Sequence, residues 1–293
     1  MAATHSPPEI LSDWSAIRVT GSDRVSFLQG QLTQDVATVL PDQPRLAGWA
    51  SAKGRLLCTT WLCDWNDALF LLLPAELAAD VTRRLQMFVL RADVQLEISP
   101  NTVSLIRDFS DDKKLINNCY YNDNRFDFAV TNDWGLQLRA AGTEDPPAGD
   151  DAGDTASEKL RSLCIAAGLP VITTPTREAF VPQMVNLDLL DGISFSKGCY
   201  VGQEIVARTQ NLGRIKRRMF RFQCAQTDVS AGDPVMNGGQ AAGTVVDAVT
   251  TDTGCELLAV IKLDQLGGAL TLAGDVSLTH APLPYPVPEQ AGH

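Results

Sequence analysis

The C-terminal part of the sequence constrains the fold most strongly, because glycines divide it into short hydrophobic runs. From Arg221 onward these runs read RFQCA, GTVVDAV, ELLAVIK and ALTLAG. Glycines stand between or within them at positions 232, 238, 239, 243, 254, 267 and 268. Short strands separated by turn residues at this spacing are typical of small antiparallel barrels and sandwiches. The sequence therefore predicts an antiparallel β-barrel over residues 214–293.

The preceding residues show a mixed pattern of strands and helices. Apolar residues recur at helical spacing after Ser22, which predicts a capped amphipathic helix over residues 23–38. The runs RLAGWAS, RLLCTTWLC and ALFLLL then have the character of strands. Pro74 opens a second helical stretch over residues 75–90, and the strand-like VQLEIS follows it. This order indicates an antiparallel α+β fold.

A second set of elements begins near residue 102. RFDFAV and GLQLRAA read as strands, the acidic segment over residues 142–158 as a solvated loop, and SEKLRSLCIAAGLP as a helix that ends at Gly168. A chain of 293 residues exceeds the size at which one hydrophobic core stops growing. We therefore expect α+β domains over residues 1–100 and 101–213, the first completed by part of the later chain, followed by the β-barrel over 214–293.

Composition and the order of residues exclude several classes of protein. The formal net charge is −11, and the longest apolar run, ALFLLL, is far shorter than the ~18 residues of a membrane span. The N-terminal residues lack the basic and apolar regions of an export signal. No GxGxxG or GxxxxGK[ST] phosphate loop occurs. We expect a cytoplasmic protein with no membrane partner.

Histidines and cysteines limit the catalytic possibilities further. The three histidines, His5, His280 and His293, lie close to the chain ends, so a Ser/His/Asp triad, a Cys/His pair or an HExxH site is difficult to build. Seven cysteines, an odd number, indicate reduced thiols. Cys58 and Cys63 form a C-x4-C pair without a second pair or a nearby histidine. We therefore expect no intrinsic metal.

The segment ISFSKGCYVGQEIVAR, residues 193–208, carries the strongest chemical signal. A lysine ammonium about 5 Å from a thiol stabilises the thiolate by up to ~3 kcal/mol, whereas an exposed helix N-terminus supplies only about 0.3–1 kcal/mol. Proximity of Lys197 would therefore decide whether Cys199 is reactive. Gly198 and Gly202 permit close approach of a ligand. The alternative is that Cys199 is a small buried hydrophobe and Glu204 only favours the start of a helix.

Positive charge is concentrated around this segment. Seven basic residues and one acid, Glu204, lie between Lys197 and Arg221 in an otherwise acidic chain. A local basic segment of this kind favours a small anion over an extended nucleic-acid surface, for which the whole domain would be basic. The alternative is an ordinary solvated helix and strand edge. We expect no direct binding of nucleic acid.

At this level of detail the sequence resembles a known family. KGCYVGQEIVAR, with PQMVNLD before it and LGRIKRRMFRF after it, resembles the YgfZ-type folate-binding proteins, relatives of the glycine cleavage aminomethyltransferase (T-protein). The resemblance extends to GSDRVSFLQGQLTQDV, to KGRLLCTTWL and to the glycine-spaced C-terminal segment. It therefore touches all parts of the chain.

The resemblance implies a fold, a cofactor and a set of site residues. The implied fold is a three-domain ring of two intertwined ferredoxin-like α+β domains and a C-terminal barrel around a central channel for tetrahydrofolate. The implied function is assembly or repair of iron–sulfur clusters in client enzymes, some of which modify tRNA. Cys199 and Lys197 would be the catalytic pair. The implied cofactor-binding residues are Gly198, Tyr200, Gly202, Gln203, Glu204 and Arg208.

One departure from the enzymatic relatives separates the alternatives. The aminomethyltransferases carry an aspartate pair where this chain has Cys58 and Thr59. Transfer of a one-carbon unit from folate needs a carboxylate near the pterin. The loss of the pair therefore argues against the alternative function, a folate-dependent aminomethyltransferase. A third reading is a passive RNA-contacting module. Trp49, Trp61, Trp134 and Tyr200 are candidates for stacking on a pterin, and Gln31 and Arg55 for lining the channel.

Overall fold

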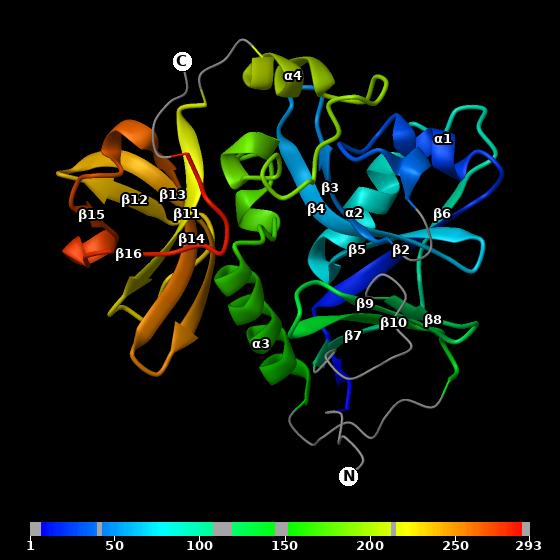
Figure 1. Ribbon diagram of the computed structural model, residues 1–293, viewed down its shortest axis with the longest axis horizontal. Coiled ribbons are helices and arrows are strands. Elements are labelled where there is room, and N and C mark those ends of the chain that lie inside the picture. The colour runs from blue at the N-terminus through cyan, green and yellow to red at the C-terminus, as the bar shows by residue number, and fades with distance from the viewer. Residues whose placement is uncertain (1–6, 40–42, 108–118, 144–151, 212–214, 289–293) are drawn as a thin grey trace. The chain divides into compact units, whose positions relative to one another are not determined.

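The computed structural model describes residues 7–39, 43–107, 119–143, 152–211 and 215–288 (Figure 1). The chain divides into two compact units. Unit 1 comprises Met1–Gly30, Asp35–Leu46 and Thr60–Leu160, and unit 2 comprises Gln31–Gln34, Ala47–Thr59 and Arg161–His293. The fold is mixed α/β, with more strands than helices. The acidic segment predicted as a solvated loop over residues 142–158 lies outside the described residues at 144–151, and from Ala152 onward it is helical, so that part of the prediction is wrong. The basic residue Arg214 also lies outside the described residues.

The first sheet has the strand order β3-β4-β5-β2-β6. Its strands are β3 (Arg45–Ala50), β4 (Leu56–Trp65), β5 (Ala68–Pro74), β2 (Trp14–Thr20) and β6 (Gln95–Ile98). Every residue of β5 is buried, which confirms the reading of ALFLLL as a buried strand. The continuous apolar run is explained because both faces of this strand are covered.

The predicted helix over residues 23–38 is only partly present. Helix α1 covers Arg24–Gln29, and a single 3-10 turn, η1, covers Val36–Thr38. Between them the chain is irregular, and Gln31–Gln34 belong to unit 2: Leu32 forms a β-bridge with Trp49, and Thr33 N donates to Gly48 O at 2.9 Å. The helical spacing was therefore misleading, because long-range backbone bonds replace the helical ones after Gly30.

The helix predicted over residues 75–90 is also shorter than expected. Helix α2 covers Ala75–Gln86, and Pro74 precedes it as predicted. Beyond its end Met87, Phe88 and Leu90 are exposed, so they do not continue the buried face of the helix. The apolar run predicted a longer helix because hydrophobicity alone does not tell which side chains are covered.

A second sheet lies in unit 1, with the order β1-β7-β10-β9-β8. Its strands are β1 (Glu9–Ile10), β7 (Thr102–Arg107), β10 (Trp134–Arg139), β9 (Arg125–Ala129) and β8 (Cys119–Tyr121). The predicted strands RFDFAV and GLQLRAA are confirmed as β9 and β10. An aromatic cluster joins this sheet to the first, with the rings of Trp61 and Phe128 centred 5.6 Å apart. The half-buried Trp61 therefore packs against an aromatic side chain of the second sheet within unit 1.

The C-terminal residues of unit 2 form a curled antiparallel sheet with the order β15-β12-β13-β14-β11-β16 (Figure 1). Its strands are β11 (Arg217–Cys224), β12 (Pro234–Asn237), β13 (Gln240–Thr251), β14 (Gly254–Lys262), β15 (Leu270–Thr271) and β16 (Thr279–Ala281). Register shifts within β12 and within β13 help the sheet to bend. Phe220, Phe222 and Leu257 are among the residues of its core. The predicted antiparallel character is confirmed, with the sheet curled as a half-barrel.

The remaining helices and 3-10 turns lie in the chain segments that connect successive strands. Helix α3 covers Ala152–Ala167 and ends at Gly168, whose φ of +68° is the left-handed value expected at a glycine stop. Helix α4 covers Gln203–Asn211. The short 3-10 turns are η3 (Thr174–Thr176), η4 (Pro182–Val185), η5 (Leu263–Gln265) and η6 (Ala273–Asp275). None of the helices within the described ranges is both long and apolar enough to span a membrane.

Candidate functional site

The KGC motif lies in an irregular loop of unit 2, directly before α4. Cys199 is exposed in this loop, whereas Lys197 and Tyr200 on either side of it are buried. The ammonium of Lys197 donates to the carbonyls of Leu32 (2.8 Å) and Gln34 (2.7 Å), and it lies 5.1 Å from the centre of the Tyr200 ring. Burial raises the pKa of Tyr200 to about 12, so the phenol stays neutral. Lys197 therefore ties the motif to segment 31–34.

Segment 31–34 is joined to the chain before the motif by further hydrogen bonds. Thr33 Oγ1 donates to Gly192 O at 2.6 Å, and Ser194 N donates to Thr33 O at 2.9 Å. Gln34 Nε2 donates to Asp191 O at 2.5 Å. These bonds link residues more than 150 positions apart in the sequence. The loop that carries Cys199 is thus anchored at its start on a second, distant segment.

Two glycines anchor the other end of the loop. Gly202 has a φ of +83°, and a Cβ added there would lie 2.5 Å from Ser51 O. Gly54, in the KGR turn, has a φ of +67°, and a Cβ there would lie 2.7 Å from Ile205 Cβ. Each glycine therefore lets the other segment approach, since no side chain fits at either position. This contact gives Gly202 a packing role in addition to the implied cofactor-binding role.

The loop itself is closed by Gln203. Its backbone N–H donates to Tyr200 O at 3.1 Å, and its side-chain amide lies 3.4 Å from Gly198 O. Gly198 has open space where a Cβ would stand. Glu204 and Arg208 are exposed on α4. The structure thus brings the motif residues together around one loop and leaves its outer side open.

Cys199 differs from the other thiols of the chain. Cys58, Cys63, Cys119, Cys164 and Cys255 are buried, and Cys224 is half-buried. Burial raises the pKa of Cys58 to about 12 and also raises that of Cys63 and Cys164. A thiol must ionise to act as a nucleophile, so these buried groups are inert near neutral pH. The alternative reading of Cys199 as a buried hydrophobe is wrong.

The residues of PQMVNLD hold strand β11. Arg218 makes two bonds to the Asp188 carboxylate, at 2.6 and 2.9 Å, with both side chains 5% exposed. Asn186, in the left-handed conformation, donates from its side chain to Met219 O at 2.8 Å. Gln183 Nε2 donates to Val206 O of α4 at 2.8 Å. The motif before KGC is therefore structural, and it connects η4 to both α4 and β11.

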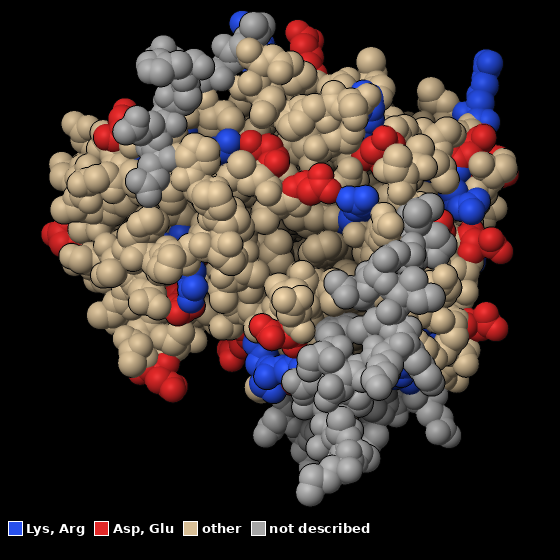
Figure 2. Space-filling view, in the orientation of Figure 1, with Lys and Arg blue, Asp and Glu red and all other residues tan. Residues whose placement is uncertain are grey.

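The basic segment consequently contains two kinds of cation. Lys197, Arg218 and Arg221 are held by carbonyls or carboxylates, the last by Glu256 at 2.7 Å. Lys216 and Arg217 are exposed and, within the described part of the chain, their side chains make no ion pair or hydrogen bond. On the face drawn in Figure 2, basic side chains of the described residues are scattered among acidic ones. The described residues form no continuous basic surface on that face.

Several buried polar atoms in unit 2 have no partner in the described structure, and two of them lie in the segments that the motif contacts. These two are Gln31 Oε1 and Trp49 Nε1, on side chains 7% and 2% exposed. Gln31 precedes Leu32, which forms the β-bridge with Trp49 and accepts from Lys197. An acceptor and a donor left unpaired in the interior are costly. Both side chains are therefore buried polar groups whose hydrogen-bonding capacity is not fully satisfied in the described structure.

The remaining candidates have structural partners. Thr59 Oγ1 donates to Pro170 O at 2.9 Å and accepts from Ile172 N at 3.1 Å, and Cys58 is buried beside it. Arg55 donates to Ala179 O at 2.6 Å. Trp134 is buried in the second sheet. Among the described residues, no group of three or more His, Cys, Asp or Glu side chains is placed to hold a metal ion.

Several known proteins are similar to this chain over most of its length. The tRNA-modifying protein YgfZ of Hamiltonella defensa subsp. Acyrthosiphon pisum is 32% identical over 228 residues, covering 72% of this chain and 68% of that protein. The proteins of the same name from Yersinia enterocolitica and Edwardsiella ictaluri are 27% and 29% identical, covering 95% and 99% of this chain and 92% and 96% of theirs. No family model matches the sequence.

One solved structure shares the fold. The glycine cleavage system aminomethyltransferase T from Bartonella henselae superposes with a TM-score of 0.65, covering 96% of this chain and 86% of that one. The two sequences are 16% identical in the superposition. At this level of identity the similarity establishes the fold alone, and the chemistry has to be inferred from the residues of the site.

Proposed function

The chain belongs to the YgfZ family of tRNA-modifying proteins, and on that premise we propose that it binds tetrahydrofolate and acts in the assembly or repair of iron–sulfur clusters. Client enzymes that contain such clusters would connect it to tRNA modification. The observation that supports this function best is the contrast between the exposed thiol of Cys199 and the anchored residues around it. In this proposal Cys199 handles sulfur, a persulfide or a cluster intermediate.

The surroundings of the motif fit a folate. Gln31 Oε1 is an unpaired acceptor and Trp49 Nε1 an unpaired donor, and the pterin edge offers both N–H groups and ring nitrogens. Tetrahydrofolate would supply nitrogen atoms that carry a one-carbon unit. Gln31 and Trp49 would orient the ring, and Gly198, Tyr200, Gly202, Gln203, Glu204 and Arg208 would line the site, as the resemblance implies. We propose a cytoplasmic location, as the sequence predicts.

The domain organisation expected from the resemblance stays a proposal. We propose that residues 1–100, 101–213 and 214–293 surround a central channel for folate. The shared architecture with an aminomethyltransferase supports this arrangement. A crystal structure with tetrahydrofolate bound tests it directly, since the pterin should contact residues from more than one of the three ranges.

Replacing the thiol tests the proposed function. Cys199→Ala should bind tetrahydrofolate as tightly as the wild type, measured by tryptophan quenching, because the thiol is not needed to hold the pterin. In cells that lack the wild-type protein, the variant should fail to restore the activity of iron–sulfur enzymes that modify tRNA. Cys224→Ala, which removes a half-buried thiol outside the motif, is the matched control and should restore that activity. Full restoration by Cys199→Ala would exclude a thiol role.

A folate-dependent aminomethyltransferase is the second candidate, and the shared fold favours it. The residues at the positions of the expected aspartate pair argue against it, because Cys58 is buried, Thr59 is bonded to Pro170 and Ile172, and neither supplies a carboxylate. Turnover of an aminomethyl carrier or of dimethylglycine in the presence of tetrahydrofolate would establish this activity. Absence of turnover by protein that binds tetrahydrofolate would leave the first candidate.

A further inference from the structure

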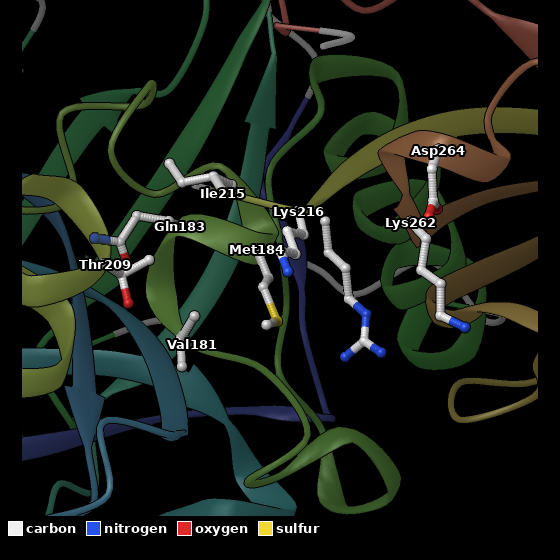
Figure 3. Close-up of a pocket in the computed structure, with 9 residues that line it drawn as sticks. Val181, Gln183, Met184, Thr209, Ile215, Lys216, Lys262 and Asp264 are labelled. Carbon is white, nitrogen blue, oxygen red and sulfur yellow. The ribbon is translucent and has the colours of Figure 1, made fainter. Parts of the chain in front are cut away.

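A cavity of about 400 Å³ opens in unit 2 beside η4 and the start of β11 (Figure 3). Small-molecule sites commonly have volumes of about 300–1,000 Å³. Three cationic side chains and one acidic side chain line the cavity together with apolar residues. The lining residues are Val181, Gln183, Met184, Thr209, Ile215, Lys216, Arg217, Lys262 and Asp264. None of these residues belongs to the KGC motif loop that carries Cys199.

Two of the cations face each other across a strand pair. Arg217 of β11 is directly opposite Lys262 of β14. Leu263 N donates to Lys216 O at 2.9 Å, a bond that brackets the Arg217–Lys262 pair and makes it a non-hydrogen-bonded pair. In such pairs the facing side chains are closest, and like charges directly opposite destabilise a sheet. The fold therefore holds two positive charges together at a local cost.

The surroundings compensate this repulsion only in part. The Lys262 ammonium donates a hydrogen bond to Ala241 O, with Nζ and O 2.5 Å apart. No hydrogen bond or ion pair holds the Arg217 or Lys216 side chain in the described structure. Asp264 is the single acid of the lining. The cavity thus has a net positive charge, and a bound anion would relieve the repulsion between Arg217 and Lys262.

The wall nearer α4 contributes a different group. Gln183 is fully buried, and its side-chain amide is fixed because Nε2 donates to Val206 O. Its Oε1 atom is buried without a partner. In the view of Figure 3, Met184 and Lys216 lie between Gln183 and Thr209 on one side and Lys262 and Asp264 on the other. An unpaired acceptor, an apolar middle and a cationic end therefore line one cavity.

We propose that this cavity binds a small organic anion, with a carboxylate or phosphate head toward Arg217, Lys216 and Lys262. An apolar body would contact Val181, Met184 and Ile215. An N–H or O–H donor of the ligand would pair with Gln183 Oε1. This inference goes beyond the proposed function, and it holds whether or not tetrahydrofolate binds near the KGC motif.

Calorimetric titration with simple probes tests the proposal. N-benzoyl-L-glutamate supplies carboxylates, an amide N–H and a ring, phenyl phosphate supplies a phosphate head, and benzamide is the uncharged control. At least one anion should bind with a Kd below about 1 mM, and benzamide should show no measurable binding. Tighter binding of the first probe assigns a carboxylate ligand, and tighter binding of the second assigns a phosphate. Failure of both anions to bind would overturn the proposal.

Variants identify the site of binding. Arg217→Gln should weaken the better probe about 10- to 100-fold, the effect of removing one charged hydrogen bond. Arg91→Gln removes an exposed arginine of unit 1 and should change the Kd less than about twofold. Because the like-charge pair is relieved, ligand-free Arg217→Gln should melt at or above the wild-type temperature. Unchanged affinity, or a lower melting temperature, would contradict the proposal.

The role of Gln183 has its own probe. N-benzoyl-N-methyl-L-glutamate keeps the ring and both carboxylates but has no amide N–H. If the first probe is the better ligand, methylation should weaken it about fivefold, since one neutral hydrogen bond is lost. Equal affinity of the two compounds would remove Gln183 from the site.

Discussion

Lys197 and Cys199 are separated by one glycine, yet their surroundings are opposite. The Lys197 ammonium is buried and held by the carbonyls of Leu32 and Gln34, whereas the Cys199 side chain is exposed. The same division runs through the neighbouring motifs: Asp188, Arg218 and Gly202 hold segments together, and Cys199 is left accessible. The motif and its neighbours therefore contain residues that anchor the loop and one residue, Cys199, that the loop exposes to solvent.

The largest expected effect concerns the buried ion pair of the anchoring region. Asp188→Ala should lower the free energy of unfolding by about 3–5 kcal/mol, because it leaves the Arg218 charge buried and unpaired. Urea denaturation measures this loss. The double variant Asp188→Leu with Arg218→Met removes both charges and should recover most of it. A single variant as stable as the wild type would mean that Asp188 does not anchor β11.

The two motif glycines sharpen the comparison next. Gly202→Ala should destabilise the protein by about 2–4 kcal/mol, since the new Cβ meets Ser51 O and the backbone is left-handed. Gly198→Ala should change the stability by no more than about 0.5 kcal/mol, because nothing lies within 4 Å of the added Cβ. Thermal unfolding of both variants checks this difference. Equal losses would place Gly198 in the anchored region as well.

Lys197 should give a smaller but clear effect. Lys197→Met keeps the length of the side chain and removes the donor to Leu32 O and Gln34 O. Two buried carbonyls then lose a partner, which should reduce the free energy of unfolding by about 2 kcal/mol. Chemical denaturation measures this change. If the variant keeps full stability, the hydrogen bonds to segment 31–34 contribute nothing, and the thiol-tuning role predicted from the sequence becomes the better explanation for Lys197.

Local sequence patterns predicted much of the fold. The fully buried ALFLLL strand, the helix stop at Gly168 and the antiparallel C-terminal strands each depend on nearby residues. The helix expected over residues 23–38 failed after Gly30, because Thr33 bonds to Gly48 and Gly192. Partners so distant in the sequence leave no periodic signal.

The site was predictable to a similar degree. The KGC motif identified the loop and its thiol, while composition left open whether Cys199 is buried. The left-handed turn at Gly54 was visible only as a Lys-Gly pair, and its contact with Gly202 needed the folded chain. The facing of Arg217 and Lys262 depends on strand register, which the sequence did not define.

Rates of alkylation of the seven cysteines test most directly whether the fold presents one accessible thiol. Native protein is treated with iodoacetamide at pH 7.5, and each cysteine is followed by mass spectrometry. Cys199 should react first and Cys224 more slowly. The buried thiols should react only when the protein unfolds, because they are covered and because burial raises the pKa of Cys58, Cys63 and Cys164. Reaction of Cys199 no faster than that of Cys164 would contradict this account.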